Sequence, residues 1–232
     1  MHHRKKIIVL TGAGISAESG INTFRDAGGL WEGHDVMEVA SIEGWHKNPE
    51  LVLDFYNQRR KQLQYVSPNP AHFAIAHLEK FFEVIVVTQN VDNLHERAGS
   101  SNVMHLHGEL LKVRSSGNPN LIYDWDEDLC LGDFCDEGHQ LRPHIVWFGE
   151  SVPMIPQAIS LVQKADIFII VGTSLQVYPA SGLIDYVKPD TPIYLVDPKA
   201  NEIKSHHRVH AFAEKAGIAL PEIANQLIQN HA

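Results

Sequence analysis

The feature that most constrains the fold is a short apolar run followed at once by glycines. Residues 7–10 are Ile, Ile, Val and Leu, of which three are β-branched. Such a run is too short for a buried helix and is typical of a strand covered on both faces of a parallel sheet. Gly12, Ala13 and Gly14 follow, and residues 15–18 can begin a helix. The sequence therefore predicts a strand, a glycine turn and a helix start in succession.

This succession is suited to bind phosphate. Glycine lets the backbone turn at positive φ and approach a ligand, and a helix N-terminus presents N–H groups to an anion. The spacing of Gly12, Gly14 and Ala17 satisfies the dinucleotide fingerprint, with alanine in the third place. An NAD dehydrogenase would have a strand ending in an acidic residue about 20 residues later. Here a polar, glycine-rich stretch over residues 19–31 follows, better suited to fold over a ligand. A mobile surface loop is the alternative, which its two aromatic residues disfavour.

Composition and charge exclude several classes of protein. The chain has 232 residues, 44% of them hydrophobic, enough for one large core or a large lobe with a smaller one. No apolar run reaches about 18 residues, so we expect no membrane span, and the first run is too short for a signal peptide. Two cysteines give no disulfide framework, and we expect a cytoplasmic protein. A net charge of −9 argues against broad nucleic-acid binding and leaves room for a basic peptide partner.

Further apolar strands, each followed by polar residues, are predicted along the chain. These strands are residues 83–87, 166–171 and 193–196. Polar groups at the carboxyl ends of apolar strands are where open α/β sheets bind ligands, although Asn90 and Asp92 also suit turn or helix-cap positions. Because the strands alternate with helical stretches, the sequence predicts an α/β fold with a Rossmann-like, doubly wound parallel sheet.

One predicted helix carries an arginine on an otherwise apolar face. Asn48 can cap this helix, which would begin at Pro49. Tyr56 and Arg59 lie three residues apart on one face, so two explanations are open. Either the arginine packs its stem and extends its head to water, or the pair binds a carboxylate. Arg60 is the rival of Arg59 for the second role.

His105 and His107 are predicted to lie on one face of a strand over residues 103–109. An H-x-H pair can bind a metal, but no cysteine or carboxylate set accompanies it locally. Histidine also suits a proton acceptor, because its unperturbed pKa lies near neutral pH. A structural role is the alternative for each.

Several segments resemble the sirtuins, the NAD-dependent protein-lysine deacylases. GAGISAESGINTFRDAGGLW at residues 12–31 is similar to their cofactor-loop signature, and TQNVDNLHERAG at residues 88–99 to their second signature. GTSLQVYPA at residues 172–180 also matches the family. The Tyr56-x-x-Arg59 pair resembles the one that binds succinyl, malonyl or glutaryl groups in the class III branch. The resemblance covers almost the whole chain and is weakest over residues 110–140.

The resemblance implies roles for individual residues. His107 would be the general base and Asn90 the second catalytic residue, while Phe24 would shield the reactive ribose from water. The residues that would bind NAD are Gly12, Ala13, Gly14, Ser16, Phe24, Arg25, Trp31, Gln89, Asn90, Val91, Asp92, Gly172, Thr173, Ser174, Asp197 and Ala216. For Asp197, capping a turn is an equal alternative. The residues that would bind the substrate are Tyr56, Arg59, Val146, Phe148, Gly149, Glu150 and Val177. Tyr56 and Arg59 would contact the acyl group, and the others an extended peptide.

Sirtuins commonly carry a structural zinc site in the region that corresponds to residues 110–142. Here only Cys130 and Cys135 remain of the usual four cysteines, and structural zinc requires four ligands. Zinc is therefore doubtful, and we expect no metal. The residues that could otherwise complete a ligand set are Asp133, Asp136 and His139. The residues expected to hold this region by packing are Leu121, Ile122, Tyr123 and Trp125.

Two lobes are expected. Residues 1–34, 83–109 and 143–232 would form the Rossmann-like NAD-binding lobe, and residues 35–82 with 110–142 the small lobe. The implied function is removal of acyl groups from protein lysine, preferentially succinyl, malonyl or glutaryl, with weaker deacetylation and release of nicotinamide and O-acyl-ADP-ribose. The alternatives are a protein mono-ADP-ribosyltransferase and a non-catalytic NAD-binding sensor. The expected partners are acylated-lysine proteins or peptides, with no nucleic acid and no membrane; the oligomeric state stays open.

Overall fold

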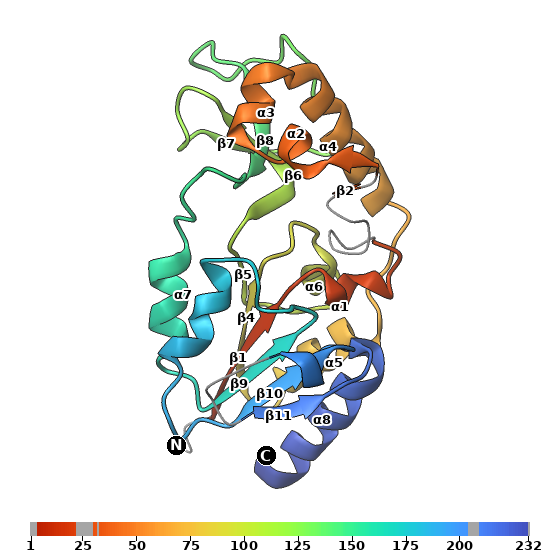
Figure 1. Cartoon of the computed structure of the whole chain (residues 1–232), viewed down its shortest axis with the longest axis vertical. Helices are drawn as coiled ribbons and strands as arrows, with labels where there is room; N and C mark the ends of the chain where they lie inside the picture. Colours follow the sequence, from red (N-terminus) through yellow and green to blue (C-terminus); the bar gives the residue numbers. More distant parts are fainter. Residues whose placement is uncertain (1–3, 22–29, 32, 204–208, 232) are drawn as a thin grey trace.

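The larger sheet has six parallel strands and forms one end of the molecule (Figure 1). The computed structural model describes residues 4–21, 30–31, 33–203 and 209–231. The strand order is β11-β10-β9-β1-β4-β5. The strands are β1 (Lys6–Thr11), β4 (Glu83–Thr88), β5 (Val103–His105), β9 (Ile167–Val171), β10 (Ile193–Val196) and β11 (Val209–Phe212). The order reverses between β1 and β9, the point at which doubly wound sheets bind ligands. The predicted doubly wound parallel sheet is confirmed, with β11 as a strand that the sequence did not predict.

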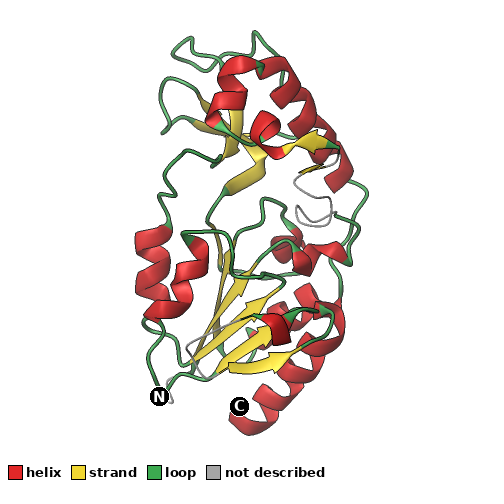
Figure 2. Ribbon diagram, viewed as in Figure 1, coloured by secondary structure: helices red, strands yellow, loops and turns green. Residues whose placement is uncertain are grey.

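Apolar side chains alternate along the strands, so both faces of this sheet are buried. Ile7 and Val9 pack with α5 (Pro70–Leu78) and α8 (Ala216–His231). Ile8 and Leu10 pack on the other face with α7 (Ile155–Val162) and the 3-10 helix η1 (Ala180–Tyr186). Figure 2 shows these helices on the two sides of the strands. Full burial of one such side chain stabilises a fold by about 1.5–3 kcal/mol.

The helix start predicted at Pro49 is found, and a second helix begins in the same way. The Asn48 side chain accepts a hydrogen bond at the start of α4 (Pro49–Leu63), and the Asn69 side chain does the same for α5. Both helices have proline in their first turn. The remaining short helices are α1 (Gly14–Ala17), α2 (Val36–Val39), α3 (Ile42–Lys47), α6 (Leu94–Arg97) and the 3-10 helix η2 (Ala200–Glu202). None of the helices formed by the described residues has the length and apolar character needed to cross a membrane.

A three-stranded antiparallel sheet, in the order β7-β6-β8, lies at the other end of the molecule (Figure 1). Its strands are β6 (Gly108–Ser115), β7 (Ile122–Asp124) and β8 (Leu141–Ile145), and a short hairpin pairs β2 (Leu30–Trp31) with β3 (His34–Asp35). Helices α2, α3 and α4 share a core with this sheet. Tyr123 packs partly against that core, as do Leu121 and Trp125. Ile122 is 43% exposed, contrary to expectation, because neighbouring residues of a strand point to opposite faces.

The predicted single strand over residues 103–109 is wrong. β5 ends at His105 and β6 begins at Gly108, so His107 lies in the connection between the two sheets. Gly108 has a φ of 85°, and a Cβ at this position would collide with the backbone of His144. This glycine therefore turns the chain from the large sheet into the small one.

The glycines of the first loop are needed for close approach and not for positive φ, which corrects one expectation. Neither Gly12 nor Gly14 is among the positive-φ glycines. A Cβ on Gly12 would lie 2.8 Å from the Gly172 carbonyl oxygen, and one on Gly14 would lie 2.7 Å from the Gly172 Cα. The missing side chains thus allow the loops after β1 and β9 to pack against each other.

Candidate active site

The carboxyl ends of the strands lie in register, so the residues that follow them meet along one edge of the large sheet. His105, Thr88, Thr11 and Val171 are successive partners across β5, β4, β1 and β9. The strands point toward the part of the molecule that carries the small sheet (Figure 1). The predicted polar segments after β1, β4 and β9 are therefore brought together at this edge.

Ser16 joins the loop after β1 to the loop after β4. Its Oγ donates to Asp92 Oδ2 at 3.0 Å and accepts from Asn90 Nδ2 at 3.1 Å. Asp92 Oδ1 accepts from the Leu94 N–H at 3.1 Å, and the three polar side chains are buried. Burial raises the pKa of Asp92, against the opposing effect of its hydrogen bonds with Leu94 and Ser16. Three predicted site residues thus form one hydrogen-bonded group.

Gln89 crosses β1 to reach the loop after β9. Its N–H donates to the Thr11 carbonyl at 2.9 Å, and its Nε2 donates to Thr173 Oγ1 at 3.3 Å. In the part of the chain that the structure describes, Ser174 Oγ and Asn93 Oδ1 are buried without hydrogen-bond partners. Buried polar atoms of this kind are costly unless they are satisfied. A polar ligand seated at the strand ends would satisfy them, so the site fits a nucleotide.

His107 has the protonation pattern of a proton acceptor. Its Nδ1 lies 3.0 Å from the Gln89 carbonyl oxygen, and a carbonyl only accepts, so Nδ1 carries the hydrogen. The neutral ring then has its lone pair on Nε2, for which the described residues provide no partner. Burial lowers the pKa of His107, and the hydrogen bond to Gln89 opposes this. The imidazole is thereby kept neutral, the state that a general base requires.

Both ring nitrogens of His105 face oxygen acceptors, as expected for a protonated imidazole. Its Nδ1 donates to the Asn90 carbonyl at 2.9 Å, and its Nε2 lies 2.8 Å from Glu96 Oε1. Burial alone would lower the pKa of His105, but Glu96 and the Asn90 carbonyl raise it overall. The two histidines therefore hold consecutive carbonyl groups, each through its Nδ1. No group of three or more potential metal ligands occurs among the residues that could be described.

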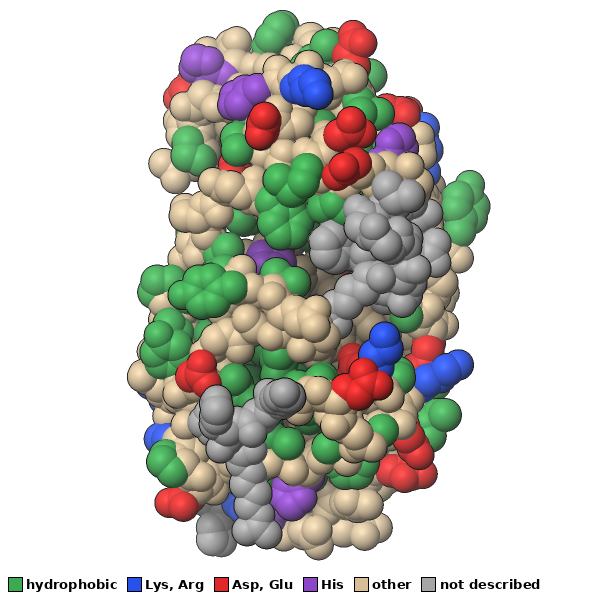
Figure 3. Space-filling view, in the orientation of Figure 1, with side chains coloured by type: hydrophobic (Ala, Val, Ile, Leu, Met, Phe, Trp, Pro, Cys, Tyr) green, Lys and Arg blue, Asp and Glu red, His purple; other side chains and the backbone are tan. Residues whose placement is uncertain are grey.

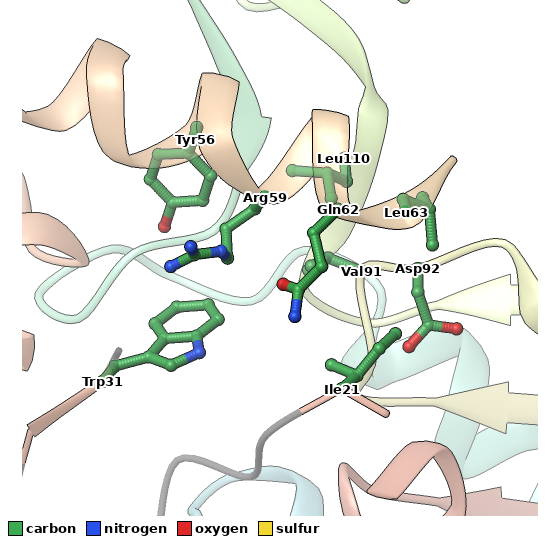
Figure 4. A pocket seen from close by; sticks show the side chains of 9 residues that line it. All are labelled: Ile21, Trp31, Tyr56, Arg59, Gln62, Leu63, Val91, Asp92 and Leu110. Carbon is green, nitrogen blue, oxygen red and sulfur yellow. The ribbon is translucent and has the colours of Figure 1, made fainter. Parts of the chain in front are cut away.

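A pocket of about 40 Å³ lies between α4 and the loop after β4. Figure 4 shows the Tyr56 hydroxyl and the Arg59 guanidinium group close together at one end, with the Trp31 indole facing them. The other residues that line the pocket are Ile21, Gln62, Leu63, Val91, Asp92 and Leu110. Two predicted acyl-binding residues and three predicted cofactor-binding residues therefore border one cavity.

Arg60 is placed as a structural residue, outside that pocket. It is 1% exposed, and its Nε donates to the Leu110 carbonyl at 3.2 Å. Its Nη1 donates to Asn57 Oδ1 at 2.7 Å and to the Glu127 carbonyl at 3.0 Å. These bonds tie α4 to the small sheet, so Arg59 alone of the two arginines lines the cavity.

The segment predicted to pair with a peptide already uses several of its N–H groups. Those of Val146, Trp147 and Phe148 donate to His107 O, Glu150 Oε2 and Ala40 O, each at 2.9 Å. The Phe148 side chain is nevertheless 43% exposed. Figure 3 shows hydrophobic side chains around a hollow at mid-height of the molecule.

The remaining predicted site residues are not hydrogen-bonded, among the described residues, to the group formed by Ser16, Asn90 and Asp92. Asp197 Oδ1 accepts from the Lys199 N–H at 2.9 Å, as the turn-cap alternative requires. Ala216 is buried at the start of α8, and Val177 lies half-buried beyond β9. Phe24 and Arg25 lie outside the described residues. Cys135 is buried and donates to Ser115 Oγ at 3.2 Å, whereas Cys130 is exposed.

Sequence reasoning missed Trp147 as a neighbour of the pocket. Its Nε1 donates to the Tyr56 hydroxyl at 2.9 Å, across 91 residues of sequence. No local pattern signals a contact of this kind.

Comparison with known proteins gives one family. The Sir2 family profile matches residues 12–179. The chain is 59% identical over 225 residues to an NAD-dependent protein deacylase of Helicobacter pylori (strain ATCC 700392 / 26695), covering 97% of this chain and 98% of that protein. A protein of the same name from Bacteroides thetaiotaomicron is 53% identical over 230 residues, with 97% and 98% covered.

Solved structures agree with this match. A complex of a Sir2 homologue with NAD superposes with a TM-score of 0.85 at 37% identity, covering 99% of this chain and 91% of that one. Sir2 bound to an acetylated peptide gives a TM-score of 0.74 at 28% identity, with 98% and 93% covered.

The His105–Glu96 pair predicts a pH-dependent contribution to stability. The pKa of His105 is raised in the folded protein, so the pair contributes its full stabilisation at pH values below the ordinary pKa of 6.5. This stabilisation is lost as the pH rises through the pKa of the folded state. The pKa of Glu96 is lowered, so the carboxylate persists to below 4.5. Because Glu96 is 40% exposed, solvent weakens the pair. We expect His105→Gln to lower the free energy of unfolding by about 0.5–1 kcal/mol more at about pH 6 than at about pH 8.5.

Urea unfolding at the two pH values measures this difference. His46→Gln, at an exposed position outside the His105–Glu96 pair, is the matched control. An equal loss for His105→Gln at both pH values would contradict the charged state of His105.

Proposed function

The chain belongs to the Sir2 family. We propose that its pocket selects acidic acyl groups on lysine. The match to the family and the relatives at 53–59% identity show that the chain is an NAD-dependent protein-lysine deacylase. Within that activity, our proposal concerns the acyl group: succinyl, malonyl and glutaryl are preferred, and deacetylation is weaker.

The observation that carries this proposal is the joint position of Tyr56 and Arg59 in one pocket (Figure 4). Moving a carboxylate out of water costs several kcal/mol unless it meets a charge and hydrogen bonds. The Arg59 guanidinium group supplies a fixed positive charge with donors, and the Tyr56 hydroxyl supplies a further donor. A neutral acetyl group carries no negative charge to pair with the guanidinium group of Arg59.

We further propose that NAD lies along the carboxyl edge of the large sheet. Gly12 and Gly14 leave room there, and Ser174 Oγ and Asn93 Oδ1 are buried polar atoms that a nucleotide would satisfy. The loop that starts α1 would meet the phosphates, and Gln89 would meet a ribose. When bound, NAD supplies the ribose that takes the acyl group and releases nicotinamide.

In this proposal His107 accepts a proton at Nε2 during transfer of the acyl group. Its Nδ1–H, bonded to the Gln89 carbonyl, fixes the ring orientation. Asn90 and Asp92 would position the nicotinamide ribose through the group that Ser16 joins. An acylated peptide would lie between the segment around Phe148 and Gly149 and the segment around Val177.

The proton-acceptor role predicts the behaviour of His107→Ala. Turnover should fall by about 10²- to 10⁴-fold because no other group replaces the base. NAD affinity, measured by calorimetry, should stay within about twofold, since the phosphates are bound by other loops. His139→Ala, at an exposed position, is the matched control. A His107→Ala enzyme with wild-type turnover would remove the assignment.

The acyl preference predicts a selective loss in Arg59→Met. Its kcat/KM for a succinyl-lysine peptide should fall by about 30-fold or more, because a buried carboxylate loses its partner charge. Deacetylation of the same peptide sequence should change by less than about threefold. Gln62→Leu, in the same pocket and helix, controls for altered shape without altered charge. Equal losses for both substrates would return Arg59 to the explanation in which its head simply reaches water.

A further inference from the structure

We propose that Trp147 is a specificity-determining residue of the acyl pocket. Its indole N–H would fix the Tyr56 hydroxyl as a donor toward the acyl group. This inference rests on the proposed function, in which Tyr56 and Arg59 bind an acidic acyl group.

In the hydrogen bond between Trp147 and Tyr56, only Trp147 can be the donor. The Trp147 Nε1 lies 2.9 Å from the Tyr56 hydroxyl oxygen, and an indole N–H can only donate. The hydroxyl must therefore accept this bond, and its own proton points elsewhere. Tyr56 is fully buried, and among the described residues its hydroxyl has no acceptor. The hydroxyl proton of Tyr56 can therefore be donated to a ligand that enters the pocket.

The pocket side of Tyr56 shows what that ligand must offer. The hydroxyl lies beside the Arg59 guanidinium group at the end of the cavity, with Trp31 opposite (Figure 4). Burial raises the pKa of the Tyr56 phenol, so the hydroxyl keeps its proton at ordinary pH. A carboxylate accepts from both Tyr56 and Arg59, whereas a methyl group accepts from neither. The end of the pocket formed by Tyr56 and Arg59 therefore favours an acidic acyl group.

Arg142 and Glu150 hold Trp147 in place. The Arg142 guanidinium carbon lies 3.5 Å from the centre of the indole ring. Glu150 accepts from the backbone N–H of Trp147 at 2.9 Å and pairs with Arg142 at 2.8 Å and Arg114 at 3.1 Å. The Glu150 carboxylate, expected from sequence to contact a peptide, is thus bound inside the chain, where it braces the indole.

Trp45 is a second buried tryptophan beside Trp147 and allows packing to be distinguished from hydrogen bonding. Trp45 lies 5.5 Å from Trp147 between ring centres, in the same buried core. No hydrogen bond joins Trp45 to Tyr56 in the described structure. Trp147 packs at 6.1 Å from the Tyr56 ring, and its indole N–H contact with the Tyr56 hydroxyl distinguishes it from Trp45.

A double-mutant cycle tests the inference. Trp147→Phe, Tyr56→Phe and the double variant are compared on succinyl-lysine and acetyl-lysine peptides of the same sequence. We expect Trp147→Phe to lower kcat/KM for the succinyl peptide by about 5- to 10-fold, mainly through KM, and for the acetyl peptide by less than about twofold. The double variant should be no worse than Tyr56→Phe, because the indole N–H then has no hydroxyl to orient.

Trp45→Phe is the matched control and should leave the ratio of the two kcat/KM values unchanged. Thermal unfolding of every variant reports whether it folds. Losses that multiply in the double variant, or an equal loss on both peptides in Trp147→Phe, would overturn the inference. A wild-type enzyme that does not prefer the succinyl peptide would instead overturn the proposed function. A succinyl preference that depends on Tyr56 and Arg59 but not on Trp147 would overturn the role of Trp147 and leave the proposed function standing.

Discussion

Short polar contacts between loops that follow neighbouring parallel strands hold the candidate active site together. Ser16 binds Asn90 and Asp92, and Gln89 reaches Thr173 across β1. These contacts exist because the strand ends are in register, which places each loop beside the next. The absence of side chains at Gly14 and Gly172 lets the central loops pack closely, at the point where the strand order reverses. The rest of the site is built on this edge.

The connection between the two sheets couples His107 to the acyl pocket. Gly108 turns the chain out of the large sheet directly after His107, whose carbonyl accepts from the Val146 N–H. The next residue, Trp147, bonds to Tyr56 on α4. A short stretch of backbone after β8 thus joins the proposed proton acceptor to the proposed acyl-binding residues.

The sequence predicted most of what depends on local patterns. Runs of β-branched residues revealed four of the six strands with approximately correct bounds, and the pair Asn48 and Pro49 marked the start of α4. A spacing of three residues on α4 placed Tyr56 and Arg59 in the same pocket. Local patterns failed where distant backbone decides the outcome: the break at Gly108 depends on contact with His144, and the role of Gly14 depends on Gly172.

Contacts between residues far apart in sequence were beyond the same reasoning. The Trp147–Tyr56 hydrogen bond and the ion pairs of Glu150 join segments that no periodicity relates. The short strand β11 lacked a long apolar run and was missed for that reason. The predicted boundaries of the two lobes and the roles of individual site residues stay predictions.

We propose that one edge of the sheet presents NAD to His107 while Tyr56 and Arg59 hold an acidic acyl group. A crystal structure of the protein with NAD and a succinyl-lysine peptide tests it most directly. We expect the nicotinamide ribose within hydrogen-bond reach of His107 Nε2 and the succinyl carboxylate between the Tyr56 hydroxyl and the Arg59 guanidinium group. A succinyl carboxylate in solvent, or an imidazole turned away from the ribose, would contradict it.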